Sequence, residues 1–257
     1  MSQKNRTKQR AGLCTGLLTG VLLTAALLLP APLLAEPQSN AFTTSDGVRI
    51  HYLTDGEAGS YVVLVHGFTS SARGNWYNTE IAQKLAENHR VVAIDMRNHG
   101  ESQVVNERQP GIVRDVLELM DHLDIDQAHM HGYSMGGFTT LAVLAYAPER
   151  LITASVGGAG VPEIGENTPS ADTYDWQEGL STRVPTSFPI DLTAVDIPVM
   201  AINGSGDAPF PKTVRMTREL NDFTNFVLPG YGHMNAMLPG TGYAERLVFF
   251  ISQNDSQ

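Results

Sequence analysis

Short apolar runs alternate with longer helical patterns along most of the chain. The short runs are rich in Val and Ile, and most of them end in glycine or a polar residue, which is typical of strands buried on both faces of a sheet. This alternation predicts an α/β fold with a mostly parallel, doubly wound sheet and helices on both faces. The predicted strands are residues 61–67, 90–95, 128–132, 152–160, 197–204 and 225–230, and the predicted helices lie around residues 79–88, 112–123, 136–145, 211–221 and 243–252.

Two segments depart from this alternation. The opening stretch FTTSDGVRIHYLTDG alternates around Asp-Gly turn signals, which predicts an antiparallel hairpin at the edge of the sheet. Residues 161–196 show little periodicity and contain four prolines, with seven acidic residues against one basic residue. A long irregular stretch inside a compact domain is more often functional than idle, so this segment is expected to be an insertion, or short cap, over the sheet. If its charge faces the entrance of a site, it should repel anionic substrates.

The first 35 residues form a separate segment. Four basic residues precede the apolar run GLLTGVLLTAALLL, which is followed by a short APLLA. This is the layout of a secretory signal, with Leu33 and Ala35 at the minus-three and minus-one positions. An uncleaved anchor is the alternative, since the stretch from Ala11 to Leu29 approaches the length that spans a bilayer. We therefore expect residues 1–35 to be a signal peptide and the protein to be secreted or periplasmic.

Composition narrows the class of protein. Residues 36–257 are long enough for one sizeable domain. The formal net charge of the whole chain is −10, and the basic residues of the leader leave the remainder more acidic still. This surplus argues against nucleic acid or an anionic membrane surface as a partner. The single cysteine, Cys14, lies in the leader, so residues 36–257 have neither a disulfide nor a thiol nucleophile.

Side chains with catalytic chemistry follow three of the predicted strands. Ser134 lies in HGYSMGGF directly after one strand, Asp207 follows another in NGSGD, and His233 follows the last in GYGHMNA. In parallel sheets of this kind, ligands bind beyond the carboxyl ends of the strands. Serine, acid and histidine are therefore expected at one edge of the sheet, in that order along the chain.

These motifs resemble those of the α/β-hydrolase superfamily of lipases, esterases and peptidases. The chain order serine, acid, histidine matches that family, and Gly-x-Ser-x-Gly between a strand and a helix is its nucleophile elbow. Five stretches correspond in order to five family motifs, from about residue 45 to the C-terminus: HGF, DMRNHGES, GYSMGG, GSGD and GYGH. One Gly-x-Ser-x-Gly alone is weak support, whereas five motifs in register are strong.

The resemblance gives each of these residues a role. Ser134 is the expected nucleophile, His233 the base that accepts its proton, and Asp207 the acid that fixes the imidazole tautomer and stabilises its charged form. The backbone amides of Phe68 and Met135 are the expected donors of the oxyanion hole. The flanking glycines leave room for the sharp turn that exposes the serine hydroxyl.

Two alternatives stay open at this point. Glu163 follows the preceding strand and is a second candidate for the acid, although Asp207 alone follows a strand in a tight glycine turn. His129 and His131 lie two apart on one face of a strand and could form a metal pair, but no third ligand is in view. The triad with Asp207 is therefore preferred, and neither a metal nor a cofactor is expected.

The chain departs from the family pattern in two places. Asn98 stands where the family's Asp-x-Arg-Gly-x-Gly has its first glycine, and because Asn tolerates positive φ, the loop is expected to keep its shape. The cap, residues 161–196, is far shorter than usual, which implies a shallow or open pocket. Trp176, Phe188 and Phe210 are the candidate substrate-binding residues, and each could equally be local core.

The expected function is that of an exported serine hydrolase that cleaves an ester or related acyl bond of a small or medium substrate through an acyl-enzyme. The same site could cleave a carbon–carbon bond, or pass the acyl group to an acceptor other than water. A non-catalytic binding module is the third possibility, but it would not require Ser134, Asp207 and His233 together. Serine at the elbow, where an aspartate would stand, disfavours epoxide hydrolase and haloalkane dehalogenase chemistry. The expected partner is a small-molecule acyl substrate.

Overall fold

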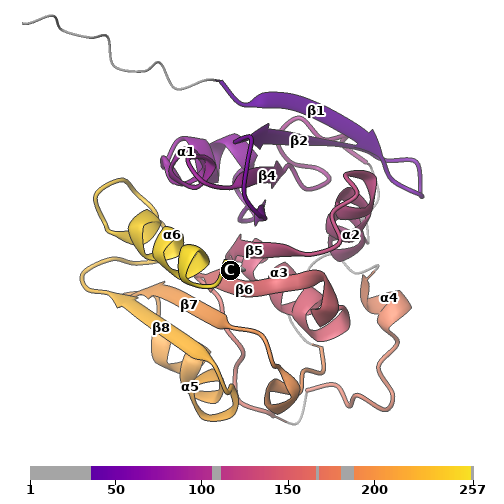
Figure 1. The fold of residues 1–257 in the computed structure, drawn as a ribbon. Coiled ribbons are helices and arrows are strands. Elements are labelled where there is room, and N and C mark those ends of the chain that lie inside the picture. Colours follow the sequence, from indigo (N-terminus) through magenta and orange to yellow (C-terminus); the bar gives the residue numbers. More distant parts are fainter. Residues whose placement is uncertain (1–35, 106–110, 166–167, 181–187, 256–257) are drawn as a thin grey trace, which may run out of the picture. The chain divides into compact units, whose positions relative to one another are not determined.

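An eight-stranded sheet forms the centre of the structure (Figure 1). The structure, a computed structural model, describes residues 36–105, 111–165, 168–180 and 188–255, so the predicted signal peptide lies outside the described residues. The strand order is β1-β2-β4-β3-β5-β6-β7-β8; β2 pairs antiparallel with β1 and β4, and the other pairs are parallel. The strands are β1 (Gln38–Thr43), β2 (Arg49–Asp55), β3 (Tyr61–Val65), β4 (Arg90–Ile94), β5 (Ala128–Tyr133), β6 (Leu151–Gly157), β7 (Val199–Gly204) and β8 (Phe223–Leu228).

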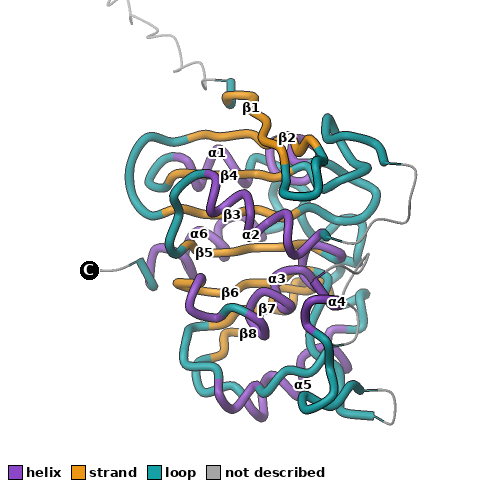
Figure 2. The backbone as a smooth tube through the Cα atoms, turned by 90° about the vertical axis from the view of Figure 1, so that its right-hand side faces the viewer, coloured by secondary structure: helices purple, strands orange, loops and turns teal. Residues whose placement is uncertain are grey.

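Helices cover both faces of this sheet. Helices α1 and α6 pack on one face, and α2, α3 and α5 pack on the other (Figure 2). Each predicted strand and helix is found within a few residues of its predicted bounds, so the predicted fold class is confirmed. The helices are α1 (Ile81–Ala86), α2 (Ile112–His122), α3 (Met135–Tyr146), α4 (Trp176–Leu180), α5 (Pro209–Glu219) and α6 (Tyr243–Gln253).

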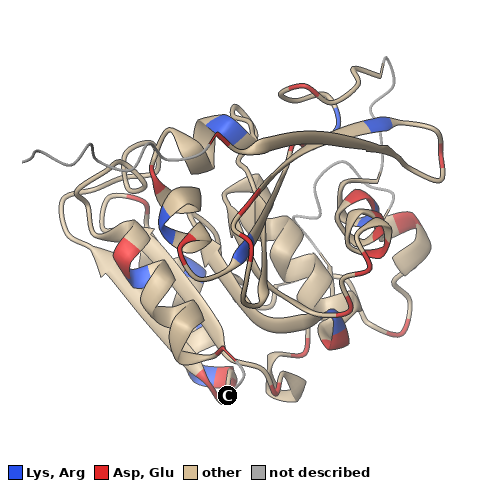
Figure 3. Ribbon diagram, turned by 45° about the horizontal axis from the view of Figure 1, so that its top comes forward, with Lys and Arg blue, Asp and Glu red and all other residues tan. Residues whose placement is uncertain are grey.

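The two faces of the sheet carry separate hydrophobic cores. Val116 of α2 and Leu141 of α3 belong to one core, and Leu85 of α1 and Leu247 of α6 belong to the other. Strands β5 to β8 contain no Asp, Glu, Lys or Arg, and the charged residues of the described ranges lie on helices, in loops and at the ends of β2 and β4 (Figure 3). Strands covered on both faces must be apolar along most of their length, which is why the sequence pattern predicts them well.

The predicted hairpin is also confirmed. Strands β1 and β2 pair in register from Gln38 opposite Thr54 to Thr43 opposite Arg49. The connection between them contains Gly47, whose φ of 83° lies in the left-handed region that glycine adopts at low cost. β1 is the outermost strand of the sheet, next to β2. The hairpin therefore closes one edge of the sheet.

The insertion at residues 161–196 is largely irregular where it is described. Its regular parts are the short helix α4 and a 3-10 turn at Leu192–Ala194. Trp176 of α4 packs against Tyr146 at the end of α3, with 5.4 Å between the ring centroids. The described part of the insertion thus lies against the helical layer on the α3 side of the sheet. None of the helices that the structure describes is long and apolar enough to span a bilayer.

Two buried histidines of β5 complete their hydrogen bonds inside the protein. Nδ1 of His131 lies 2.8 Å from the Ser155 hydroxyl, and its Nε2 lies 2.9 Å from the Tyr243 hydroxyl. Nδ1 of His129 lies 2.9 Å from Oγ1 of Thr153. Within the described ranges, no group of three or more His, Cys, Asp or Glu side chains could hold a metal ion. Nε2 of His129 lies 3.5 Å from Oδ1 of Asp255, so the two imidazoles join β5 to β6, to α6 and to the segment after α6.

Burial makes His131 a source of acid sensitivity. Desolvation lowers the pKa of this imidazole from 6.5 to about 3, so the folded protein keeps it neutral where the unfolded chain binds a proton. The free energy of unfolding should therefore fall as pH decreases through this interval, by about 1.4 kcal/mol per pH unit for this one group. Urea unfolding at a series of pH values measures the slope. The variant His131→Gln, whose amide can still bond Ser155 and Tyr243, should lose that part of the slope, and an unchanged slope would contradict the argument.

Candidate active site

Ser134 forms the turn between β5 and α3. Its backbone has φ 53° and ψ −112°, a conformation that residues other than glycine seldom adopt. The turn is held by a hydrogen bond of 2.7 Å from the Ser134 amide to the carbonyl oxygen of Gly157 in β6. Backbone strain of this kind clusters at functional sites, where the surrounding structure maintains it. The strand-to-helix elbow expected from GYSMGG is present.

Two glycines make room for this elbow. A Cβ atom on Gly132 would lie 2.0 Å from the carbonyl oxygen of Gly136, and a Cβ on Gly136 would lie 1.9 Å from the carbonyl oxygen of Val65. Both distances are far inside van der Waals contact, so a side chain at either position would displace the backbone. The glycines on either side of the serine are therefore required by the close approach of β3, β5 and α3.

His233 and Asp207 lie beside Ser134 at the carboxyl edge of the sheet. Nε2 of His233 is 2.9 Å from Oγ of Ser134, and Nδ1 of His233 is 2.7 Å from Oδ2 of Asp207. An ionised carboxylate only accepts hydrogen bonds, so Asp207 fixes the imidazole proton on Nδ1 and leaves Nε2 to accept the hydroxyl proton. The structure thus brings residues from three separate motifs into one hydrogen-bonded chain.

Tyr133, the residue before the elbow serine, supports the histidine. Its ring lies 5.4 Å from the His233 ring, centroid to centroid, and its hydroxyl donates to the backbone carbonyl oxygen of His233. Burial raises the pKa of Tyr133, so the phenol remains a donor at neutral pH. The His233 side chain is 37% exposed and that of Asp207 is 13% exposed. The imidazole therefore faces solvent on one side and a mostly buried acid on the other.

The loop after β3 carries the expected oxyanion donor Phe68. The peptide group that contains its amide is oriented through the carbonyl oxygen of Gly67, which accepts from Nδ1 of His66 at 2.7 Å and from the Ser70 amide at 3.1 Å. Nε2 of His66 in turn accepts from the Met96 amide at 3.0 Å, so this ring is neutral with its proton on Nδ1. Burial lowers the pKa of His66 to about 4, so this arrangement persists at neutral pH.

The other expected oxyanion donor is the amide of Met135. This residue begins α3 directly after Ser134. The first amides of a helix have no partner within it, and the helix dipole favours negative charge at this end. Phe68 and Ser134 line one cavity, and Met135 directly follows Ser134 in the chain. The role of the two amides in stabilising an oxyanion stays a prediction.

A cavity of about 330 Å³ opens beside Ser134 and His233. The loop after β3 and the loop before α6 form its walls. Three of its lining side chains are large, apolar and solvent-exposed: Phe68 at 49%, Met234 at 81% and Leu238 at 52%. No Asp, Glu, Lys or Arg in the described part of the chain lines it. The cavity is therefore open, uncharged and rimmed by apolar groups.

The three candidate substrate-binding residues do not line this cavity. Trp176 packs against Tyr146 and also against Phe188, whose ring centroid lies 6.1 Å away. Phe210 lies in the first turn of α5, where its side chain is 73% exposed. The structure therefore places none of the three in the lining of the cavity at Ser134, because Trp176 and Phe188 pack on each other and Phe210 lies on α5. Their role in substrate binding stays a prediction.

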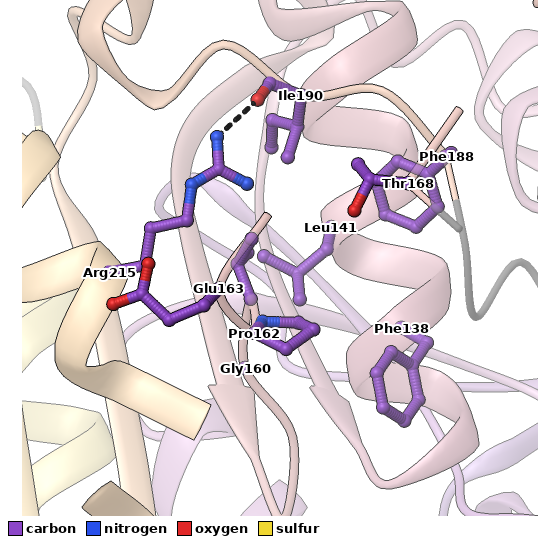
Figure 4. A pocket seen from close by; sticks show the side chains of 10 residues that line it. Phe138, Leu141, Gly160, Pro162, Glu163, Thr168, Phe188, Ile190 and Arg215 are labelled. Atoms are coloured by element: carbon purple, nitrogen blue, oxygen red, sulfur yellow. Dashed lines mark hydrogen bonds between the residues drawn. The ribbon is translucent and has the colours of Figure 1, made fainter. Parts of the chain in front are cut away.

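A second cavity, of about 50 Å³, lies between α3 and the segment that follows β6 (Figure 4). Phe188 and Glu163 both line it. The Glu163 carboxylate is bonded to the Arg218 guanidinium at 2.7 and 2.9 Å. The alternative acid is thus paired with α5, whereas Asp207 is the acid bonded to the histidine. Arg218 therefore neutralises the charge of Glu163, and Glu163 does not line the cavity beside Ser134.

The loop that contains Asn98 keeps the expected shape. Asn98 has a φ of 67°, in the left-handed region where glycine would be favoured. Its side-chain oxygen accepts a hydrogen bond of 2.7 Å from the Val105 amide. Arg97 in the same loop is buried and forms ion pairs with Asp46 and Asp115. The expected positive φ at Asn98 is confirmed.

Sequence reasoning missed three residues that contact the predicted site. Tyr133 supports His233, as described, and Lys212 forms an ion pair of 2.7 Å with Asp207. The side chain of Asn75 accepts a hydrogen bond of 2.8 Å from the Gly67 amide. The position of Tyr133 beside the site could be predicted from the sequence, because it directly precedes Ser134. No local motif marks the other two, since their contacts depend on how α5 and the loop after β3 fold back.

Comparison with known proteins agrees with this geometry. The sequence profile of the family described as alpha/beta hydrolase fold matches residues 61–188. Over 111 residues the chain is 42% identical to the dihydrolipoyllysine-residue acetyltransferase component of the acetoin cleaving system of Pseudomonas putida, covering 42% of this chain and 29% of that protein. Over 95 residues it is 36% identical to esterase YbfF of Escherichia coli strain K12, covering 36% of this chain and 35% of the esterase. The chain thus spans about a third of the length of these two relatives.

A solved structure extends the likeness over most of the chain. The 2-hydroxy-6-oxo-6-phenylhexa-2,4-dienoate hydrolase of Rhodococcus sp. strain RHA1 superimposes with a TM-score of 0.67 at 22% identity, covering 84% of this chain and 99% of that one. At this identity the likeness concerns the fold alone. The matching profile and this structure agree that the chain has the α/β-hydrolase fold.

Proposed function

We propose that this protein is a serine hydrolase that cleaves an ester or related acyl bond through an acyl-enzyme. The observation that carries the proposal is the continuous hydrogen-bonded chain from Ser134 through His233 to Asp207, which borders an open cavity. A binding module would need neither these hydrogen bonds between Ser134, His233 and Asp207 nor a serine held in a strained turn. The similarity to an esterase of Escherichia coli supports the same reaction class.

The proposed steps use the hydrogen bonds between Ser134, His233 and Asp207. Oγ of Ser134 attacks the acyl carbon while Nε2 of His233 takes the hydroxyl proton, and the resulting oxyanion accepts from the amides of Phe68 and Met135. The imidazolium then gives its proton to the leaving alkoxide, and the alcohol departs from the acyl-enzyme. Water attacks the acyl group with loss of a proton to the same imidazole, and the imidazolium then returns that proton to Oγ of Ser134 as the bond from Oγ to the acyl carbon breaks and the acid leaves. Asp207 stabilises the imidazolium in both halves of the reaction.

The cavity favours a neutral, apolar acyl group of small or medium size. Its volume of about 330 Å³ lies at the lower end of the roughly 300–1,000 Å³ that is typical of small-molecule sites. Met234 and Leu238 offer apolar surface, and methionine adapts readily to ligands of different shape. A charged acyl group would lose hydration here without meeting an opposite charge.

Transfer of the acyl group to an acceptor other than water is the second candidate. The similarity to an acetyltransferase component of Pseudomonas putida favours it, as does the open position of His233, whose side chain is 37% exposed. Hydrolysis and transfer are distinguished by adding a small alcohol and measuring released acid against the new ester. Cleavage of a carbon–carbon bond would use the same three residues and is tested by substrates that lack an ester.

A panel of p-nitrophenyl esters with increasing acyl length tests the proposed function. We expect kcat/KM to be highest for neutral acyl groups of medium length, and about tenfold lower for a matched ester with a terminal carboxylate, a difference of about 1.4 kcal/mol. The variant Leu238→Trp narrows the exposed rim and should shift the preference toward shorter chains. Phe249→Trp, on the exposed surface of α6, is the matched control. A preference for the anionic ester, or no hydrolysis of any ester, would contradict the proposal.

We also propose that the protein is exported to the periplasm or secreted. The basic start and the apolar run within residues 1–35 support this, because they follow the order of a secretory signal. The negative formal charge of the chain fits a soluble acyl substrate better than an anionic surface.

A further inference from the structure

The acid of the proposed triad has a second charged partner. Nζ of Lys212 lies 2.7 Å from Oδ1 of Asp207, while Oδ2 of the same carboxylate lies 2.7 Å from Nδ1 of His233. Each carboxylate oxygen therefore has its own partner. The side chains of Lys212 and Asp207 are 26% and 13% exposed, so solvent screens their interaction only in part.

The fold fixes the position of this lysine. Lys212 lies in α5, and a Cβ atom on Gly160 would be 2.3 Å from its carbonyl oxygen, so the backbones of α5 and the segment after β6 are in close contact. Nζ of Lys212 also lies 3.5 Å from the carbonyl oxygen of Gly158. A Cβ on Gly158 would lie 2.8 Å from Cε1 of His233. The ammonium group thus connects α5 with the acid and with the backbone that packs on the histidine.

We propose that Lys212 is a positioning residue for Asp207. It holds the carboxylate in the orientation that meets His233, and its positive charge offsets part of the negative charge that the imidazole experiences. This inference rests on the proposed function, in which Asp207 stabilises the imidazolium form of His233.

The neighbouring charges determine whether loss of Lys212 stabilises or destabilises the imidazolium form of His233. The ionisable side chains that the described residues bring against Asp207 and His233 are Lys212 from α5 and Tyr133 from β5. The phenol of Tyr133 is uncharged at neutral pH, so Lys212 supplies the positive charge. Without it, the carboxylate should stabilise the imidazolium more strongly, and a higher pH should be needed to free Nε2 as a base.

The pH profile of ester hydrolysis tests this effect. In Lys212→Met the acidic limb of kcat/KM should move to higher pH by about half a unit to one unit. Its plateau should fall about three- to tenfold, because the carboxylate loses one anchor. Lys212→Arg keeps the charge and should keep the wild-type limb. Lys84→Met, which removes an exposed ion pair of 2.9 Å with Glu245, is the matched control and should change neither quantity.

NMR separates this inference from the proposed function. The imidazole of His233 is titrated in the Ser134→Ala background with and without Lys212→Met, which requires no turnover. The titration midpoint should rise by the same half unit to one unit, about three- to tenfold in proton affinity. An unchanged or lower midpoint overturns the inference, as does an equal shift in Lys212→Arg. Absence of ester hydrolysis by the wild type contradicts the proposed function alone, since the midpoint still reports the coupling.

Discussion

Replacing Ser134 with alanine should abolish ester hydrolysis and leave the fold intact. We expect kcat to fall by about 10⁴- to 10⁶-fold, because the residues of a catalytic triad act as a unit and loss of the nucleophile removes the acyl-enzyme route. The fold should survive because Ser134 already holds a φ of 53° with a Cβ atom in place. Rates with the best p-nitrophenyl ester and the midpoint of thermal unfolding measure the two effects.

Covalent labelling tests whether Ser134 is the nucleophile without the use of a substrate. A fluorophosphonate should modify the wild-type protein at Ser134 and leave the alanine variant unmodified. Ser252 is exposed near the end of α6 and gives a matched control, since Ser252→Ala should retain both hydrolysis and labelling. Mass spectrometry that finds the label on another serine, or retained hydrolysis in Ser134→Ala, would remove the basis of the proposed function.

The fold was predictable because its strands leave a strong local signal. The sequence of β6, LITASVG, and that of β7, VMAING, are nearly uncharged runs that end at glycine, since both faces of the sheet are covered. Strand ends are less well marked. The predicted run at residues 152–160 extends past β6, because Gly158 has a φ of 60° that ends the strand, and apolarity alone does not show this.

The proposed catalytic residues were also accessible from local motifs. Ser134, Asp207 and His233 each follow a strand within a glycine-containing turn, and parallel strands bring such turns to one edge. The linings of the cavity were not accessible in this way. Met234 and Leu238 lie in an irregular loop, and their position beside the serine results from the path of the chain between β8 and α6.

The sequence also does not show where the aromatic side chains of the insertion pack. Trp176 and Phe188 contact each other and the helical layer, and an apolar ring in a short cap carries no sequence signal that separates packing from substrate contact. Lys212 is a residue beside the proposed site that the sequence pattern does not mark. It stands five residues after Asp207 in the chain, but only the start of α5 at Pro209 turns its ammonium group back toward the carboxylate.

Replacing Asp207 with asparagine should lower kcat/KM by about 10⁴-fold. The carboxylate fixes the His233 proton on Nδ1 across a distance of 2.7 Å, and it offsets the charge of the imidazolium. An amide supplies no such charge, and its NH₂ group facing Nδ1 would place the imidazole proton on Nε2. That nitrogen could then no longer accept from the Ser134 hydroxyl, which lies 2.9 Å away. Fluorophosphonate labelling should slow in parallel with hydrolysis.

Glu163→Gln is the matched control for this substitution, because it makes the same chemical change in the only other candidate acid. The Glu163 carboxylate is 52% exposed and bonded to Arg218, so its loss should leave kcat/KM within about twofold of the wild type. The comparison uses the ratio of kcat/KM between the two variants. Any general effect of removing one negative charge cancels in this ratio. If Glu163→Gln lost more activity than Asp207→Asn, the acid would have to act from the segment after β6, and the ion pair with Arg218 would have to open during turnover.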